Sequence, residues 1–550
     1  MVHLHKKKIK GHIYYYIRET RWVDGTSKVV WQKYLGSAEK ILEVFERCGQ
    51  APSVRVSSFE YGKTAAFLKI SDELGFVESV NRNTSKKKIE GLTVGEYMLL
   101  IILGRSNGPL SKEATARWFD ESFLKYLWRF SHKLNSQNFL NNMDFITEDS
   151  MRSIEEDLAA TMIQNGIKPT TIFWDATNVF TYIEKGEKLT RKGKSKEKRY
   201  DKNLVAFGIA ESDENIPLMH ETYPGNVSDA KIFPEIIDKI VERLRNLKID
   251  TEDMTLVFDK GNNSADNINK ILEDMHVVGS AKHNQVRRLL KVPLSEYTFL
   301  YKNSSNSNIS GYRSKHTLFG KEFTVVVAYN PKSHKKQEKT YEENREKILA
   351  KFEELKKKSE KKHGRGRRIT KKGLYANANR VIPDDLTRIF RFEIHGEEKP
   401  TFEYWIDDTA EQEFKMTFGK IAVFTDFHDM SSADIARTYF AKDIVEKDFE
   451  FLKDKFLIPV PPFYVRKDGR IRVHVFLCVT GMMFYRYMAR KVRDLELSIK
   501  ELDHQLERIR VAFVQDKDTN EVILVVEEMN TTQAKLFSEL GLGDFLVQAN

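Results

Sequence analysis

Short apolar runs bounded by turn residues predict two buried strands in the middle of the chain. The run from Thr170 to Trp174 leads into Asp175, and the run from Thr255 to Phe258 leads into Asp259. Apolar, β-branched and aromatic runs of this length are typical of strands inside a sheet. Two carboxylates are therefore expected where strands end.

A helical spacing follows from Ser431 to Lys453. Val445, Phe449 and Leu452 recur on one side, which predicts an apolar stripe docked on the core. Beside this stripe, a helix face about 60° wide carries four polar residues. They are Tyr439, Lys442, Glu446 and Lys453. A helix docked in this way would hold the polar row at the edge of the core, facing a cleft.

Such patterns, followed along the whole chain, divide it into six regions. Residues 166–285 and 419–492 alternate strands and helices, which predicts an α/β core in two parts. Residues 286–418 lose that rhythm and are interpreted as a β-rich insertion. The remaining regions are a small N-terminal β-containing region (1–55), a helical domain (56–165) and a C-terminal region (493–550), a candidate for dimerisation.

The helical domain contains a helix, the turn Gly108-Pro109 and a second helix that Ser111 is expected to cap. A pair of helices joined by a turn is compatible with DNA reading and equally with ordinary helix packing. The pattern alone leaves both interpretations open.

Composition indicates an ordinary globular protein with patches of positive charge. The 550 residues include 90 Lys and Arg against 80 Asp and Glu, for a formal charge of +10. A polyanion-binding surface on an otherwise balanced protein is expected from this small excess. Only two cysteines occur, and no apolar run reaches the roughly 18–20 residues of a membrane span. We expect a cytoplasmic protein without a signal peptide or a membrane partner.

Two glycine-interspersed basic segments are candidate contacts for a nucleic-acid backbone. Charge runs are usually solvated faces, but glycine-interspersed basic loops also suit contacts to phosphate groups. The first contributes Arg191, Lys192, Lys194, Lys196, Lys198 and Arg199, and the second contributes Arg365, Arg367 and Arg368.

Three acidic residues, Asp175, Asp259 and Glu446, suit phosphodiester cleavage as catalytic residues and metal ligands. Two Mg²⁺ ions activate the attacking oxygen and stabilise the leaving oxygen, and each takes only one or two carboxylates. Acids that compete for these roles are Asp201, Asp229, Asp443, Glu450 and Asp454. The sequence contains no serine-nucleophile elbow, P-loop or HExxH zinc motif.

The third acid lies in a pattern that resembles a known family, the DDE transposases of insertion sequences with the Y-R-E-K signature (the insertion-sequence family four superfamily). That signature, Tyr-x2-Arg-x3-Glu-x6-Lys, matches Tyr439, Lys442, Glu446 and Lys453 in every spacing, with lysine in place of arginine. Other segments similar to the family are Asp175-Ala176-Thr177-Asn178, Pro224-Gly225-Asn226-Val227-Ser228-Asp229, Asp259-Lys260-Gly261 with Ser264, and Pro109-Leu110-Ser111-Lys112. The resemblance covers residues 95–490.

This resemblance implies an RNase H-like core interrupted by a β-rich insertion between the second Asp and the Glu. It implies a transposase that uses two Mg²⁺ ions, for which Mn²⁺ can substitute, to cleave transposon ends and join the 3′-OH to target DNA. Its partners would be double-stranded DNA, as inverted-repeat ends and target, and a second copy of the chain in a synaptic complex. Tyr439, Lys442 and Lys453 would bind terminal phosphates, and residues 56–165 would bind the DNA ends. The setting would be the nucleoid of a bacterial or archaeal cytoplasm.

Two other hypotheses stay open at this point. The chain could be a catalytically inactive or domesticated DNA-binding protein derived from a transposase, or an RNase H-like nuclease or resolvase that cuts without joining. The complete set of three acids favours an enzyme. The row from Tyr439 to Lys453 and the long insertion favour the transposase.

Overall fold

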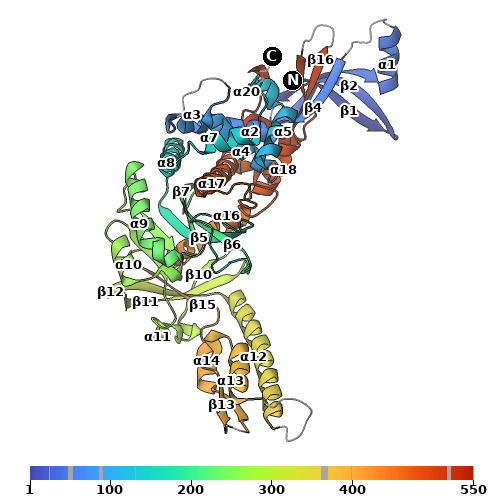
Figure 1. Cartoon of the computed structure of the whole chain (residues 1–550). Coiled ribbons are helices and arrows are strands. Elements are labelled where there is room, and N and C mark those ends of the chain that lie inside the picture. The colour runs from blue at the N-terminus through green and yellow to red at the C-terminus, as the bar shows by residue number, and fades with distance from the viewer. Residues whose placement is uncertain are drawn as a thin grey trace. The chain divides into compact units, whose positions relative to one another are not determined.

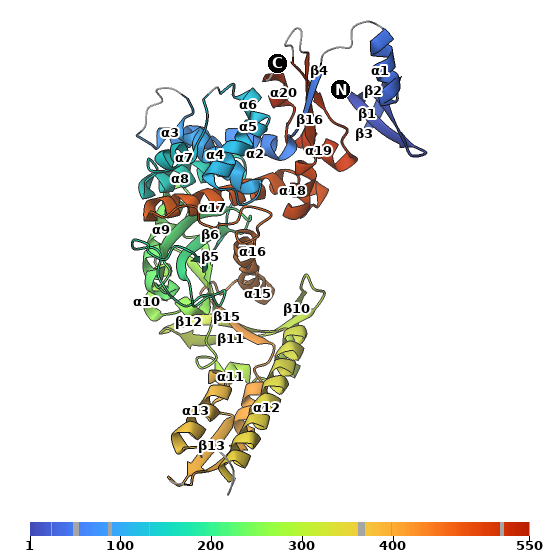
Figure 2. The same cartoon turned by 45° about the vertical axis from the view of Figure 1, so that its right-hand side comes forward.

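The computed structural model describes residues 1–23, 25–47, 54–85, 91–130, 132–360, 369–397, 399–516 and 522–548. The chain comprises two compact units, Met1–Met254 with Asp443–Asn550, and Thr255–Lys442. The structure is mixed α/β, with a nine-stranded mixed sheet. Figures 1 and 2 label the elements. No helix in the described part of the chain is long and apolar enough to cross a membrane.

The first unit begins with strands, continues with helices and then enters the sheet. Its elements before residue 255 are β1 (Val2–Ile9), β2 (His12–Val23), β3 (Thr26–Gly36), α1 (Ala38–Arg47), β4 (Val54–Glu60), α2 (Gly62–Leu74), α3 (Phe76–Arg82), α4 (Val94–Ser106), α5 (Lys112–Glu121), α6 (Leu124–Leu127), α7 (Ser136–Met143), α8 (Glu148–Gln164), β5 (Thr171–Thr181), β6 (Asn203–Ser212), β7 (Pro217–Pro224) and α9 (Asp229–Asn246). After residue 442 they are α16 (Asp443–Phe451), α17 (Asp468–Lys491), α18 (Ile499–Glu507), β16 (Arg510–Asp516), β17 (Val522–Val526), α19 (Thr531–Glu539) and α20 (Asp544–Gln548).

Strands of this unit form three antiparallel groups. β1, β2 and β3 are consecutive neighbours, β16 lies between β4 and β17, and β6 lies between β5 and β7. Helix α17 is buried on all sides and packs against α2, α4, α8 and β7. A helix that is apolar all round is typical of the interior of a large core. This helix is therefore the centre of the helical part of the unit.

The second unit contains the other strands of the mixed sheet and a helical extension. Its elements are β8 (Thr255–Phe258), α10 (Ala265–Ile271), β9 (His276–Ser280), α11 (Arg287–Leu290), β10 (Thr298–Lys302), β11 (Asn308–Leu318), β12 (Lys321–Tyr329), α12 (Pro331–Glu360), α13 (Lys371–Val381), β13 (Phe390–His395), β14 (Thr401–Ile406), α14 (Asp408–Lys415), β15 (Lys420–Thr425) and α15 (Ser432–Ala441), with three short 3₁₀ turns, η1 (Lys260–Asn262), η2 (Leu294–Glu296) and η3 (Asp384–Leu386). The strand order is β10-β11-β12-β15-β9-β8, and only the β8–β9 pair within this order is parallel.

The expected β-rich insertion at 286–418 is wrong in two respects. Strands β10, β11 and β12 belong to the mixed sheet, since β12 pairs with β15. The part that leaves the sheet, from α12 to α14, is mainly helical, and among its described residues the β13–β14 hairpin packs with these helices (Figure 1). The pattern of a single strand does not show which distant strand it will pair with, so the sequence could not assign β10–β12 to the sheet.

Ser111 caps α5 as predicted, because its hydroxyl accepts a hydrogen bond from the Ala114 N–H at 3.2 Å. The next residue, Lys112, is only 3% exposed. Burial, and to a lesser degree the Arg105 guanidinium, lower the pKa of Lys112 to about 7. Ser111 and Lys112 therefore have structural roles in the helical domain.

The buried ammonium makes a pH-dependent contribution to stability. Between pH 7 and the ordinary lysine pKa of 10.5, the unfolded chain binds one more proton at Lys112, so the free energy of unfolding rises with pH. The substitution Lys112→Met should remove this rise. Its effect on the free energy of unfolding, variant minus wild type, should therefore favour the folded state more at pH 6 than at pH 9.5, by an amount on the order of 2 kcal/mol.

Urea unfolding of wild type and variant at the two pH values measures this difference. Lys125→Met is the matched control, because Lys125 is exposed in the same domain. A difference between Lys112→Met and wild type that is the same at both pH values would contradict the prediction.

Candidate active site

Asp175 lies in the middle of β5, not at its end as the sequence suggested. The strand continues to Thr181, and Asp175 is paired with Ile209 of β6. Antiparallel pairing with β6 on both sides of the acid supplies backbone hydrogen bonds that the apolar run alone did not reveal. The Asp175 carboxylate is partly exposed, and its Oδ1 accepts the Ala176 N–H at 2.8 Å.

Helix α16 covers the face of β5 and β6 that carries Asp175. The ring of Phe449 packs edge-on against Phe207, with centroids 5.7 Å apart, and Phe207 is paired with Thr177 of β5. Lys453 Nζ donates a hydrogen bond to Thr177 Oγ1 at 3.1 Å. Because alternate residues of a strand share one face, Asp175 and Thr177 both point to the side of α16.

The helix predicted from Ser431 to Lys453 is in fact two helices. Lys442 separates α15 from α16, and its N–H bonds to the Tyr439 carbonyl at 3.3 Å in a tighter turn than an α-helix makes. Lys453 follows the end of α16 at Phe451. The four signature residues therefore do not share one continuous helix face.

The apolar stripe of this segment is confirmed. Val445, Phe449 and Leu452 are all buried. Glu446 is exposed on α16. Asp443 and Glu450 are exposed as well, so exposure does not distinguish Glu446 from these two acids.

Asn178 connects β5 to the first basic loop. Its amide donates to the Lys194 carbonyl and accepts the Lys196 N–H, each at 3.0 Å. The other wall of the loop is the Pro-Gly-Asn segment: the Gly225 N–H donates to the Leu189 carbonyl at 3.2 Å. A Cβ on Gly193 would lie 2.2 Å from the Gly225 carbonyl oxygen, so only glycine fits there. Three segments distant in sequence are thus held together beside Asp175.

The six cations of this loop divide into two groups. Lys192, Lys194 and Lys198 are exposed, and their ammonium groups make no hydrogen bond or ion pair with the described residues. Arg191 donates to the Thr190 and Glu187 carbonyls, Lys196 donates to the Ala176 carbonyl, and Arg199 pairs with Asp201. Lys192, Lys194 and Lys198 are therefore the stronger candidates for phosphate contacts. Arg365, Arg367 and Arg368, predicted in the second basic segment, lie outside the described residues.

A cavity of about 810 Å³ opens beside Lys453. Its lining includes Phe180, Tyr182, Lys455, Phe463 and Tyr464. The guanidinium of Arg199 lies 4.7 Å from the centre of the Phe180 ring, and Lys202 lies 5.0 Å from that of Tyr182. Tyr182 is 66% exposed. Exposed aromatic rings among cations are the combination with which proteins bind unpaired nucleic-acid bases.

In the second unit, Asp259 directly follows β8, as predicted. The Lys442 ammonium lies 3.3 Å from Asp259 Oδ1, although the Lys442 side chain is 11% exposed and that of Asp259 is 53% exposed. A lysine as buried as Lys442 requires an anion nearby to remain charged. Tyr439 is buried at 8% exposure and packs edge-on against Phe440, so packing is part of its role.

The donor chemistry of the three acids fits Mg²⁺, which prefers carboxylate oxygens. Asp175, Asp259 and Glu446 all reach solvent. Within the described residues, no three His, Cys, Asp or Glu side chains form a ready-made metal-binding group.

A buried charge network that the sequence did not reveal fixes α16 in place. Asp448 is fully buried, and its Oδ1 accepts a hydrogen bond from Arg486 Nε of α17 at 2.9 Å. Burial and the nearby Asp448 carboxylate raise the pKa of Glu211 of β6 well above its ordinary value.

Arg486→Met should destabilise the protein by about 3–5 kcal/mol, because it leaves a buried carboxylate without its cation. Asp448→Leu combined with Arg486→Met should lose less than Arg486→Met alone, since both charges are then removed. Urea unfolding measures both effects. Arg493→Met, an exposed position after the same helix, is the control. A loss from Arg486→Met no larger than that of the control would contradict the role given to this network.

Comparison with known proteins adds no family assignment: no protein-family model and no curated protein matches this chain.

Proposed function

We propose that the protein is a metal-dependent DNA transposase that cleaves transposon ends and joins the freed 3′-OH to target DNA. The observation that supports it best is the way the motif segments meet around Asp175. Asn178 and Gly225 hold the basic loop, and Lys453 binds Thr177, two residues from the acid. Direct hydrogen bonds between segments that were chosen by sequence resemblance support their serving one site.

In this proposal, Asp175, Asp259 and Glu446 hold two divalent cations. When bound, these ions would activate the attacking hydroxyl and stabilise the leaving oxygen of the phosphodiester. The residues of the chain bind and orient the DNA around this chemistry. Lys192, Lys194 and Lys198 contact the backbone through charge, and the aromatic cavity beside Lys453 receives bases that leave the duplex at the cut end.

Lys442 would have two tasks in such a site. It neutralises Asp259 in the structure, and the resemblance assigns it to a terminal phosphate. A lysine ammonium is a point charge on a flexible stem, so it can serve both anions in turn, whereas a guanidinium fork is more restricted.

Asp175→Asn, Asp259→Asn and Glu446→Gln should each reduce Mg²⁺-dependent cleavage of end DNA by at least a hundredfold while leaving DNA binding within threefold. The reason is that these residues serve metal binding, whereas affinity comes from phosphate contacts. Gel assays of nicking and of strand joining measure the two reactions separately, and joining distinguishes a transposase from a nuclease that only cuts.

Asp443→Asn and Glu450→Gln are matched controls on α16, because both acids are exposed like Glu446. Cleavage that survives Glu446→Gln but is lost in Glu450→Gln would show that the third acid is Glu450. DNA binding without cleavage in wild type would favour a non-catalytic DNA-binding protein.

Neutralising Lys192, Lys194 and Lys198 to Gln should weaken duplex binding and make its salt dependence shallower. Each lost phosphate contact lowers the slope of log affinity against log salt by about 0.9. The control is Lys168, Lys248 and Lys535 to Gln, which removes equal charge elsewhere in the same unit. Equal slopes for the two triple variants would identify the loop as an ordinary solvated surface.

A further inference from the structure

A second basic cavity lies within the unit Thr255–Lys442. Its volume is about 320 Å³. Three segments line it: the loop and helix from His283 to Lys291, the residues from Asp385 to Ile389, and α14 with the turn up to Thr417. All three belong to Thr255–Lys442.

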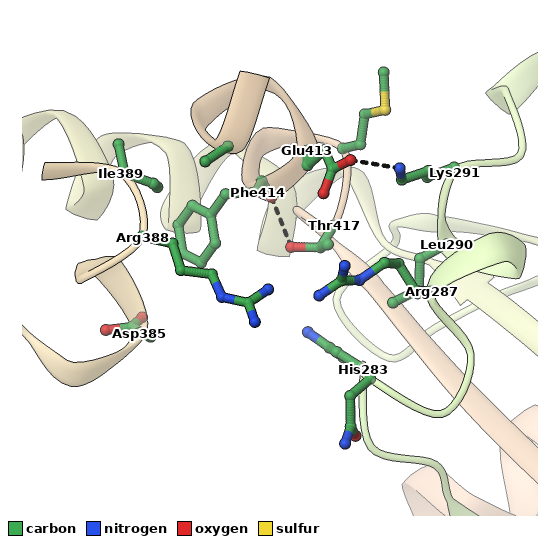
Figure 3. A pocket seen from close by; sticks show the side chains of 13 residues that line it. His283, Arg287, Leu290, Lys291, Asp385, Arg388, Ile389, Glu413, Phe414 and Thr417 are labelled. Carbon is green, nitrogen blue, oxygen red and sulfur yellow. Dashed lines mark hydrogen bonds and ion pairs between the residues drawn. The ribbon is translucent and has the colours of Figure 1, made fainter. Parts of the chain in front are cut away.

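Two arginines from different segments point into this cavity. Figure 3 shows the guanidinium groups of Arg287 and Arg388 turned toward each other, with the His283 side chain directed at the same space. Neither guanidinium forms a hydrogen bond or an ion pair with any of the residues that the structure describes. Two like charges that face each other without a counter-charge repel, and an anion between them would remove the repulsion.

The carboxylates of the cavity do not supply that anion. Glu413 is bound to Lys291 at 2.6 Å. The Lys291 ammonium, and to a lesser degree Arg287 and Arg388, lower the pKa of Glu413. Asp385 forms no ion pair among the described residues, and in Figure 3 it lies on the far side of Arg388. The space between the two guanidiniums therefore remains positive.

The backbone beneath both arginines is fixed. The side chains of Val286 and Leu290, at the two ends of α11, are buried. The Lys420 ammonium donates hydrogen bonds to the Leu290 and Val292 carbonyl oxygens at 2.6 and 2.9 Å. On the other side, Leu386 and Ile389 are buried around Arg388. The Ile389 carbonyl accepts the Asp407 N–H at 2.8 Å. Both guanidiniums are thus carried by backbone segments that are anchored by buried side chains and hydrogen bonds.

We propose that this cavity binds a phosphate group, held by Arg287 and Arg388 and supplied by the backbone of DNA. A planar guanidinium presents paired N–H donors that match two oxygens of a phosphate, and two such groups from different segments bind it from two sides. The choice of DNA as the source rests on the proposed function. A free phosphate or phosphate ester has the same chemistry and is the other source.

The test compares Arg287→Gln/Arg388→Gln with Arg288→Gln/Arg391→Gln. The control removes the same charge from neighbouring positions, Arg288 on α11 and Arg391 on β13, which are exposed and do not line the cavity. Calorimetric titration with inorganic phosphate and salt-dependent binding of duplex DNA are measured for wild type and both variants. These measurements do not depend on cleavage, so they remain informative if the three acids prove inactive.

We expect Arg287→Gln/Arg388→Gln, the cavity variant, to bind inorganic phosphate at least tenfold more weakly than wild type, or to lower the slope of log DNA affinity against log salt by about 0.9 for one lost phosphate contact. The control should stay within twofold of wild type in both. A lowered slope identifies DNA as the source, and lost phosphate binding with an unchanged slope identifies a free phosphate compound. Equal behaviour of the cavity variant and the control in both measurements would overturn the proposal.

Discussion

The position of α16 depends on the ion pair between Asp448 and Arg486. Asp448 projects into the core of the first unit, where it meets Arg486 from α17 and Glu211 from β6. A buried carboxylate is tolerated only with a compensating group, and Arg486 supplies the cation here. The contact also fixes the rotation of α16 about its axis, because Asp448 can reach Arg486 in only one orientation. Glu446, two residues earlier on α16, is exposed.

The sequence predicted well those features that depend on local periodicity. The stripe of Val445, Phe449 and Leu452 follows from helical spacing, and the cap at Ser111 follows from local hydrogen-bonding capacity. Features that depend on distant partners were not predictable in this way. Asp448 is an acid on the buried side of α16, and nothing local in the sequence indicates that Arg486, 38 residues away, is the cation that pairs with it.

The same limit explains the errors in the fold. Asp175 was expected at a strand end because a charged residue usually terminates an apolar run. Its strand continues because β6 pairs with it through Thr181. Likewise, β12 joins β15 across about ninety intervening residues, and nothing in the pattern of either strand specifies that pairing. Strand existence is local information, whereas strand partners are not.

The Asp-x-Thr-Asn segment shows why a motif can be compact in sequence and still serve several tasks. Consecutive residues of a strand alternate between its faces, so Asp175 and Thr177 point to α16 and Asn178 points away. Thr177 accepts a hydrogen bond from Lys453, and Asn178 forms hydrogen bonds with the basic loop. One strand therefore positions an acid, a cation and a polycationic loop with respect to one another. A substitution at Asn178 would move the loop without touching the acid, and so the motif links DNA affinity to the acid through backbone geometry rather than through charge.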